Sequence, residues 1–280
     1  MFKIVEKRYL NEFVVWMKIE APLIAKKVFP GQFIILRVDE FGERIPLTVF
    51  NYSRENGTIE IIYQKVGLTT MKLDAKREGD YIQDVVGPLG KKTQTLGYKK
   101  VIIVSGGVGT AIAYPLAKAL SKNGCEVDVI LGFRNKDLII LENEMKNISK
   151  SLEITTDDGS NGNKSLVTEP LRAKLGKGYF CDFVFAVGPL PMMKAVCDLT
   201  AKFGVKTFVS MTAIMIDGTG MCGGCRLTVD NQVKFACVDG PDFDGHKIDF
   251  KEAIERSKTF VSEEVLSREK YCNLFKEVKI

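Results

Sequence analysis

The chain has 280 residues, 45% hydrophobic and 27% charged, which is the composition of an ordinary globular protein long enough for two domains. No apolar run reaches the roughly 18–20 residues of a membrane helix, and the first residues lack a signal-peptide stretch, so we expect a cytoplasmic protein. The net charge of +5 comes from scattered Lys and Arg, which argues against a nucleic-acid partner.

Side-chain catalysis is also poorly supported by the composition. His246 is the only histidine, which excludes multi-histidine metal sites and makes a Ser–His–Asp triad improbable. We therefore expect the chemistry to depend on bound cofactors, with no catalytic side chain to name.

Short strands characterise residues 1–96. The stretches 13–21, 31–38 and 57–66 are rich in β-branched and aromatic residues, and Pro30-Gly31 and Asn56-Gly57 bound them. No helical period appears before Thr69, so this part predicts an antiparallel β-barrel or sandwich. Within it, residues 43–48 predict an edge strand and residues 65–73 a helix start.

Residues 97–212 alternate buried strands with helices, which predicts an α/β domain with a parallel sheet. The expected strands are 101–109, 125–133, 152–156, 182–188 and 206–211. One expected helix begins after Gly109 and has Gly124 as its C-cap. Two further helices are expected over 137–150 and 190–204.

Two glycine-containing turns of this domain are candidate ligand loops. Residues 105–111 stand where a strand enters a helix, a place where a diphosphate approaches the backbone, although a tight turn without a ligand explains the same residues. Gly188-Pro189 forms a similar turn, and Asp157 and Asp158 end another strand.

The sharpest signal lies in residues 213–250, where the spacing is Asp217-x4-Cys222-x2-Cys225-x11-Cys237. Plant-type [2Fe–2S] proteins use C-x4-C-x2-C and a distant fourth cysteine, so the first cysteine position here is Asp217. Carboxylate oxygen is an acceptable iron ligand, and four glycines among residues 218–224 allow a tight loop. Asp217 is preferred to Asp239 as fourth ligand.

Other interpretations of this segment remain open. A zinc site needs a fourth ligand, for which His246 is the only histidine, and a redox Cys-x-x-Cys pair normally opens a thioredoxin-like helix. The remaining cysteines are most simply small buried hydrophobic residues: Cys125, Cys181, Cys197 and Cys272. A charged helical tail, 251–280, closes the chain.

In this order the motifs resemble the ferredoxin–NADP reductase superfamily, with a flavin barrel first and a nucleotide domain second. The cluster motif and the run at 236–246 resemble one branch over essentially the whole chain. That branch holds electron-transfer subunits of dihydroorotate dehydrogenase and small subunits of electron-bifurcating NADH-dependent reduced ferredoxin:NADP+ oxidoreductases. Because the dihydroorotate members use four cysteines, Asp217 favours the second group.

The resemblance implies three cofactors, FAD, a [2Fe–2S] cluster and NAD(H), and a larger iron–sulfur flavoprotein partner that handles ferredoxin and NADP(H). It assigns FAD to Arg44, Pro46, Leu47, Thr48, Gly67, Leu68, Thr69 and Thr70. It assigns NAD(H) to Gly106, Gly107, Gly109 and Thr110, with Asp157, Asp158, Gly188 and Pro189 around the nicotinamide. It assigns the cluster to Asp217, Cys222, Cys225 and Cys237.

The chain departs from the superfamily pattern at two places. The flavin motif R-x-Y-[ST] is one residue longer here, from Arg44 to Thr48, and has no Tyr. The cysteine often found beside the nicotinamide is Val187. Competing functions are electron transfer to another dehydrogenase, such as dihydroorotate dehydrogenase, and a metal-stabilised structural or regulatory subunit.

Overall fold

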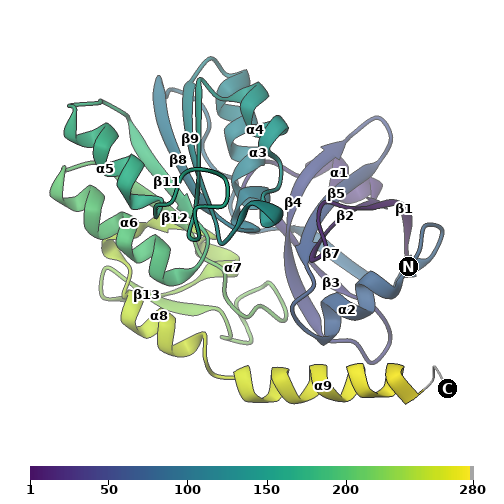
Figure 1. The fold of residues 1–280 in the computed structure, drawn as a ribbon. Coiled ribbons are helices and arrows are strands. Elements are labelled where there is room, and N and C mark those ends of the chain that lie inside the picture. The colour runs from purple at the N-terminus through teal and green to yellow at the C-terminus, as the bar shows by residue number, and fades with distance from the viewer. Residues whose placement is uncertain (278–280) are drawn as a thin grey trace.

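The computed structural model describes the backbone of residues 1–277 and the side chains of residues 1–271. The chain forms an antiparallel barrel, a parallel α/β unit, a small cysteine-bearing segment and a terminal helix (Figure 1). This arrangement confirms the predicted fold class. No helix in the described part of the chain has the length and apolarity that crossing a membrane requires.

The N-terminal sheet has seven strands. Its strand order is β6-β1-β2-β5-β4-β3-β7, with every pair antiparallel, and its two outer strands are consecutive in the chain. The strands are β1 (Phe2–Tyr9), β2 (Val14–Glu20), β3 (Phe33–Arg37), β4 (Arg44–Ser53), β5 (Thr58–Gln64), β6 (Tyr81–Ile82) and β7 (Asp84–Leu89).

Two helices accompany the barrel. The prediction that no helix precedes Thr69 is wrong, because α1 (Pro22–Lys27) follows β2. Six residues are too few to display a helical period, so the sequence offered no signal beyond its proline at the first turn. The second helix, α2 (Leu68–Ala75), begins where residues 65–73 predicted.

The second sheet is parallel except at one edge. Its order is β10-β9-β8-β11-β12-β15, and β15 (Asp242–Asp244) pairs antiparallel with β12. The other strands are β8 (Lys100–Gly106), β9 (Glu126–Phe133), β10 (Ser151–Thr156), β11 (Phe183–Val187) and β12 (Thr207–Ser210). Because β15 comes from the predicted cluster segment, that segment is attached to the parallel sheet by strand pairing.

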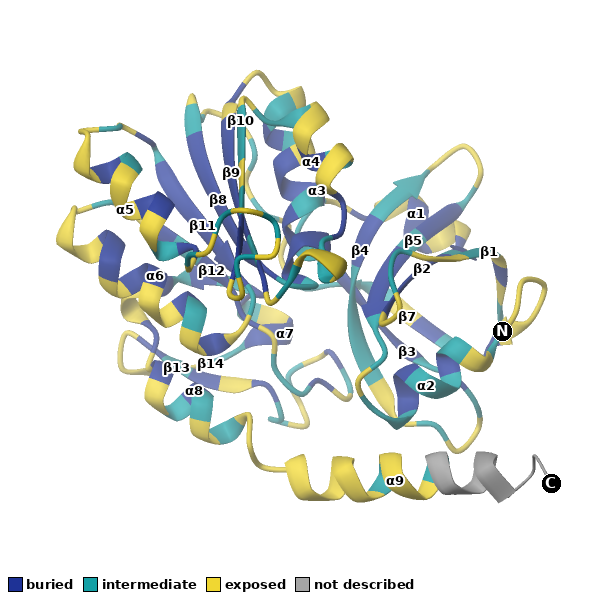
Figure 2. Cartoon of the chain, viewed as in Figure 1, coloured by how far each residue is buried: buried dark blue, intermediate teal, exposed yellow. Residues whose placement is uncertain are grey.

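Helices cover both faces of this sheet, as its two-sided apolar strands require (Figures 1 and 2). In β8, Val101 and Ile103 pack toward α3, while Ile102 and Val104 pack toward α5 and α6. The helices are α3 (Gly109–Lys122), η1 (Lys136–Leu138), α4 (Glu142–Ile148), α5 (Thr168–Gly176) and α6 (Leu190–Lys202).

The single helix predicted over 137–150 is wrong. The chain forms η1, an extended residue at Ile139, and then α4, which starts after Leu141 in a left-handed conformation with φ 58°. Ile140 and Leu141 are buried, so packing of these apolar side chains interrupts the helix that local propensity favours.

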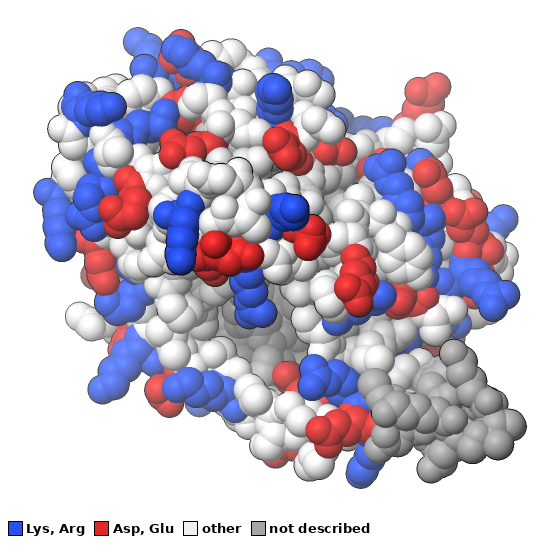
Figure 3. Space-filling model, in the orientation of Figure 1, with Lys and Arg blue, Asp and Glu red and all other residues white. Residues whose placement is uncertain are grey.

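The remaining elements follow β12. A hairpin of β13 (Arg226–Val229) and β14 (Gln232–Phe235) leads into α7 (Ala236–Asp239), β15 and η2 (Gly245–Lys247). The tail is two helices, α8 (Phe250–Arg256) and α9 (Val261–Glu277), and α9 crosses below the cluster segment to lie beside α2 (Figure 1). Basic and acidic side chains are mixed over the face in Figure 3, as the scattered charge predicts.

Candidate functional site

The barrel and the α/β unit meet at a shared apolar core that holds the two in one arrangement. Trp16, Phe50 and Ile62 of the barrel pack in the same cluster as residues of α3. The rings of Phe50 and Tyr114 stack with centroids 4.8 Å apart. This contact leaves an apolar cavity of about 430 Å³ between the units, a size typical of small-molecule and cofactor sites.

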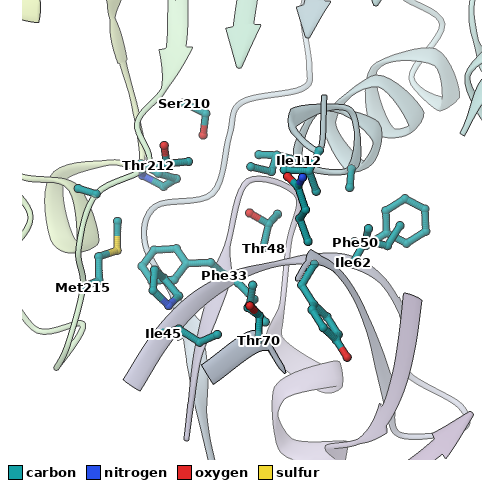
Figure 4. Close-up of a pocket in the computed structure, with 18 of the residues that line it drawn as sticks. Phe33, Ile45, Thr48, Phe50, Ile62, Thr70, Ile112, Ser210, Thr212 and Met215 are labelled. Carbon is teal, nitrogen blue, oxygen red and sulfur yellow. The ribbon is translucent and has the colours of Figure 1, made fainter. Parts of the chain in front are cut away.

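The cavity is lined by three parts of the chain (Figure 4). Thr48 and Thr70 come from the barrel side, and Ile112 comes from α3. Ser210, Thr212 and Met215 stand on the opposite wall, where β12 leads into the cluster segment. A ligand in this cavity therefore contacts all three parts at once.

The predicted flavin residues divide into two groups. Pro46, Leu47, Thr48 and Thr70 line the cavity; Arg44, Gly67, Leu68 and Thr69 do not. The Thr70 hydroxyl accepts hydrogen bonds from the Val66 and Gly67 N–H groups at 3.0 and 3.1 Å, so it caps α2. The Thr69 hydroxyl donates to Glu43 at 3.2 Å.

Sequence reasoning missed most of the lining. The additional residues share only an apolar character, which their neighbours in each strand or helix also have, so no local signal marks them. They include Phe33, Phe50, Ile62, Ile112, Met211 and Met215. Val108 and Ala111 also line the cavity and lie in the predicted ligand loop 105–111, and Ile45 lies in the segment 43–48.

The β8–α3 turn is built for close backbone approach. A Cβ atom on Gly109 would lie 2.6 Å from the Val187 carbonyl oxygen, and one on Gly106 would lie 2.6 Å from the Met192 sulfur. Gly188, which follows β11, packs directly on Gly106. The structure therefore brings the predicted glycines 106, 109 and 188 together at the carboxyl ends of adjacent strands β8 and β11, where parallel sheets bind nucleotides.

Three other predicted nucleotide residues are placed differently. Thr110 is fully buried, and its hydroxyl bonds to Ser105 at 3.0 Å, so its side chain faces the turn interior. Asp157 and Asp158 follow β10, which β9 and β8 separate from β11. At about 4.8 Å per strand, the end of β10 lies about 14 Å along the sheet edge from the end of β11. The strand order therefore does not place Asp157 and Asp158 next to Gly188 and Pro189 as predicted.

Asp158 is held in an ordered turn. Its carboxylate accepts a hydrogen bond from the Ser160 N–H at 2.9 Å. Hydrogen bonds from Ser160 keep the pKa of this exposed carboxyl below its ordinary value. The end of β10 therefore presents fixed negative charge.

The cluster loop places its four predicted ligands in two pairs. The Asp217 carboxylate accepts hydrogen bonds from the Thr219 N–H at 2.8 Å and the Cys222 N–H at 2.7 Å, on the exposed side of the loop. On its buried side, the Cys237 N–H donates to the Cys225 sulfur at 3.4 Å, and these two residues are 2% and 1% exposed.

Gly220 links the two pairs. The Thr219 N–H, and after it the Cys222 and Gly220 N–H groups, hold the pKa of the Asp217 carboxyl below its ordinary value, whereas burial raises the pKa of the Cys237 thiol and the Gly220 N–H opposes that rise. Gly218, Gly220 and Gly223 all adopt positive φ, the conformation a loop needs to point several donors inward. Arg256 of α8 donates to the Gly224 carbonyl at 3.2 Å and holds the loop from outside.

The donor set fits an iron–sulfur cluster by chemistry and spacing. Within the described residues, no three His, Cys, Asp or Glu side chains converge as closely as a single metal ion needs. Asp239 accepts from the Phe235 N–H at 2.8 Å, and the His246 ring is paired with Thr200 at 3.0 Å. Both competing ligands are therefore engaged outside the loop.

The isolated cysteines are as predicted where the structure describes them. Cys125, Cys181 and Cys197 are buried and make no disulfide, and burial raises the pKa of each thiol. The side chain of Cys272 lies outside the described residues.

The chain is similar to known proteins both in its cluster segment and along most of its length. Residues 212–249 match the iron–sulfur cluster binding domain of dihydroorotate dehydrogenase B. The chain is 46% identical to the dihydroorotate dehydrogenase B (NAD(+)) electron transfer subunit homolog of Thermotoga maritima, covering 96% of this chain and 95% of that protein. It is 36% identical to the probable subunit of Methanocaldococcus jannaschii, covering 79% and 81%.

One solved structure is similar along nearly its whole length. It comes from a study of flavin-based electron bifurcation in NADH-dependent reduced ferredoxin-NADP oxidoreductase. The TM-score is 0.91 at 44% identity, and the match covers 97% of this chain and 98% of that one.

Proposed function

The chain belongs to the family of dihydroorotate dehydrogenase B electron transfer subunits and their homologues, and on that premise we propose its specific role. It is the small subunit of a flavin-based electron-bifurcating NADH-dependent reduced ferredoxin:NADP+ oxidoreductase. In that role it passes electrons between NAD(H), FAD and a [2Fe–2S] cluster to a larger iron–sulfur flavoprotein subunit.

The cavity between the units is the observation that carries this proposal. Thr48 comes from the barrel, Val108 from the nucleotide turn, and Met215 lies two residues before Asp217. A flavin in this cavity therefore lies against the nucleotide turn on one side and the cluster segment on another. That is the order an electron path from a hydride donor to a one-electron carrier requires.

Each cofactor has residues suited to hold it. Pro46, Leu47, Thr48 and Thr70 would contact FAD, and Gly106, Gly107, Gly109, Gly188 and Pro189 would surround NAD(H). Asp157 and Asp158 would lie at the nucleotide's other end, where a carboxylate suits a ribose diol. Asp217, Cys222, Cys225 and Cys237 would ligate the cluster.

Bound FAD supplies the chemistry that joins these sites, since it exchanges two electrons with nicotinamide and single electrons with a cluster. The chain's own residues supply position and environment. The glycines at 106, 109 and 188 let the β8–α3 turn pack closely against the end of β11, which shapes the backbone surface that would face a nucleotide. The apolar walls, among them Phe33 and Ile62, exclude water from the flavin ring. Asp217 brings a harder ligand than a thiolate to the cluster.

The test is anaerobic purification followed by visible and electron paramagnetic resonance spectra of the dithionite-reduced chain. We expect flavin absorption, bleaching by NADH, and one S = 1/2 signal per chain. A Cys225→Ser variant should lose iron, while Cys181→Ser, a buried cysteine distant from the loop, should keep it. A colourless zinc protein would support a structural or regulatory subunit and overturn the proposal.

A second function is favoured by the names of the relatives, which designate electron transfer subunits of dihydroorotate dehydrogenase B. The identity of the partner subunit distinguishes the two functions. Co-purification with a flavoprotein that carries further clusters and reduces ferredoxin supports bifurcation. Co-purification with a dihydroorotate-oxidising subunit supports the alternative.

A further inference from the structure

A buried carboxylate stands directly behind the wall of the flavin cavity. Asp242 of β15 pairs with Ser210 of β12 in the antiparallel register, so the two side chains lie on the same face of the sheet. Ser210 is 4% exposed and lines the cavity, where its hydroxyl is drawn in Figure 4. Pro241, the residue before Asp242, lines it as well.

One oxygen of this carboxylate is unsatisfied. Oδ2 accepts a hydrogen bond from the Thr93 hydroxyl. Oδ1 is shielded from solvent and has no hydrogen-bond partner among the described residues, although Asp242 as a whole is only half-buried. Buried polar atoms without hydrogen-bond partners are rare and costly in folded proteins. A structural role for the Thr93–Asp242 hydrogen bond therefore does not explain the unpartnered Oδ1.

Thr93 extends this group of oxygens toward solvent. It is partly exposed and lies between exposed Lys92 and Gln94 in the segment that connects the barrel to the α/β unit. Gly31 makes room for it, because a Cβ atom there would lie 2.0 Å from the Thr93 hydroxyl oxygen. Ser210, Asp242 and Thr93 thus form a line from the cavity wall to the surface.

The proposed electron path needs an outlet for protons at this place. Each NADH that is oxidised yields NAD+, two electrons and one proton, and an iron–sulfur cluster carries the electrons away without the proton. One proton per NADH must therefore leave a cavity whose walls are mainly apolar. The threonines of the lining, Thr48, Thr70 and Thr212, can relay a proton but cannot keep one, because a hydroxyl is not a base near neutral pH.

We propose, on the basis of the proposed function, that Asp242 accepts through Ser210 the proton left in the flavin cavity and releases it to solvent past Thr93. The carboxylate takes up the proton while the two electrons leave one after the other by way of the cluster to the one-electron acceptor, and the carboxylic acid loses the proton at the Thr93 end. Ser210 exchanges one proton for another and is unchanged. Charge and atoms balance without a further reactant.

The acidity of Asp242 suits this role. Burial raises the pKa of its carboxyl to about 6, and the hydrogen bond from Thr93 opposes the rise. A group that titrates near the working pH can both take and release a proton. The charged residues of the elements around it are Lys91 and Lys92 on the connector, Asp239 on α7 and Asp244 on β15.

Three variants separate this role from a purely structural one. Asp242→Asn keeps an oxygen for the Thr93 hydroxyl but cannot accept the proton. Ser210→Ala keeps the carboxylate and removes its link to the cavity. Asp128→Asn is the matched control, since Asp128 is a 2% exposed carboxylate in β9 of the same sheet that does not line the cavity.

The kinetic experiment uses the cofactor-loaded chain, NADH, and ferricyanide as one-electron acceptor, with flavin absorbance followed anaerobically. We expect Asp242→Asn to leave flavin bleaching unchanged. We expect both Asp242→Asn and Ser210→Ala to slow flavin reoxidation at least about tenfold relative to the bleaching rate of the same variant, with an altered solvent isotope effect. Asp128→Asn should reoxidise normally. Reoxidation at the wild-type rate in both Asp242→Asn and Ser210→Ala would overturn the proposal.

A second readout needs no cofactor. In the infrared spectrum of the cofactor-free chain, a protonated carboxylic acid should appear on mild acidification and be missing in Asp242→Asn. If no such band depends on Asp242, its carboxylate does not take up protons and the proposal is wrong. If NADH bleaches no flavin in the wild-type chain, the proposed function itself fails, which is a different result.

Discussion

Replacing Asp242 with Asn should make the cofactor-free chain more stable near neutral pH. The pKa of this carboxyl is about 6 in the folded chain and its ordinary value is 3.8, with burial as the main cause. Between these two values the folded state holds a proton that the unfolded state has lost. Stability from this group is therefore present below about pH 4 and is lost as the pH rises to about 6.

The size of the effect follows from the shift. About two pKa units correspond to about 3 kcal/mol at most, because each unit is worth about 1.4 kcal/mol. Solvent reaches the half-buried residue from one side, so we expect about 1–3 kcal/mol of added stability in Asp242→Asn near pH 7. The gain should shrink to near zero around pH 4, where the wild-type carboxyl is protonated in both states.

Urea denaturation of the two chains at several pH values measures this difference, and Asp128→Asn supplies a contrast of opposite sign. The Asp128 carboxylate accepts hydrogen bonds from Ser151 and Tyr179 and lies 3.6 Å from the Lys174 ammonium. Removing its charge should destabilise the chain by about 1–3 kcal/mol. The reasoning is refuted if Asp242→Asn is less stable than wild type near pH 7, or if the difference does not depend on pH.

Three further predictions test the sites. Gly109→Ala should lower the free energy of unfolding by about 1–3 kcal/mol and weaken NADH binding, because its Cβ would lie 2.6 Å from the Val187 carbonyl oxygen. Gly176→Ala in α5, which has open space around it, is the control and should be neutral or stabilising in thermal or urea unfolding. Cys237→Ala should lower bound iron to background in a colorimetric assay while flavin stays bound; retention of two irons per chain would exclude Cys237 as a ligand. Tyr114→Ala should destabilise the contact between the barrel and α3 by about 1–2 kcal/mol and weaken FAD retention in gel filtration, because it removes the ring whose centroid lies 4.8 Å from that of Phe50. An unchanged free energy of unfolding would mean that the stacked pair contributes nothing to stability.

The features of this protein that depend on a short stretch of chain could be predicted from its sequence. The spacing from Asp217 to Cys237 identifies the cluster loop, because ligand geometry limits the number of residues between donors. The glycines at 106 and 109 mark a turn where backbones must approach closely. The strands and helices of the α/β unit follow from apolar periodicity, except where buried Leu141 interrupts the helix predicted over 137–150.

The tertiary structure alone decided which residues meet. Phe33, Ile112 and Met215 share one cavity although they lie far apart in the sequence, and nothing in their own neighbourhoods distinguishes them from other core residues. The placement of Asp157 three strand positions from β11, and of Asp242 behind Ser210, depends on strand order. Strand order results from the packing of whole elements, so a pattern read along one segment carries no record of it.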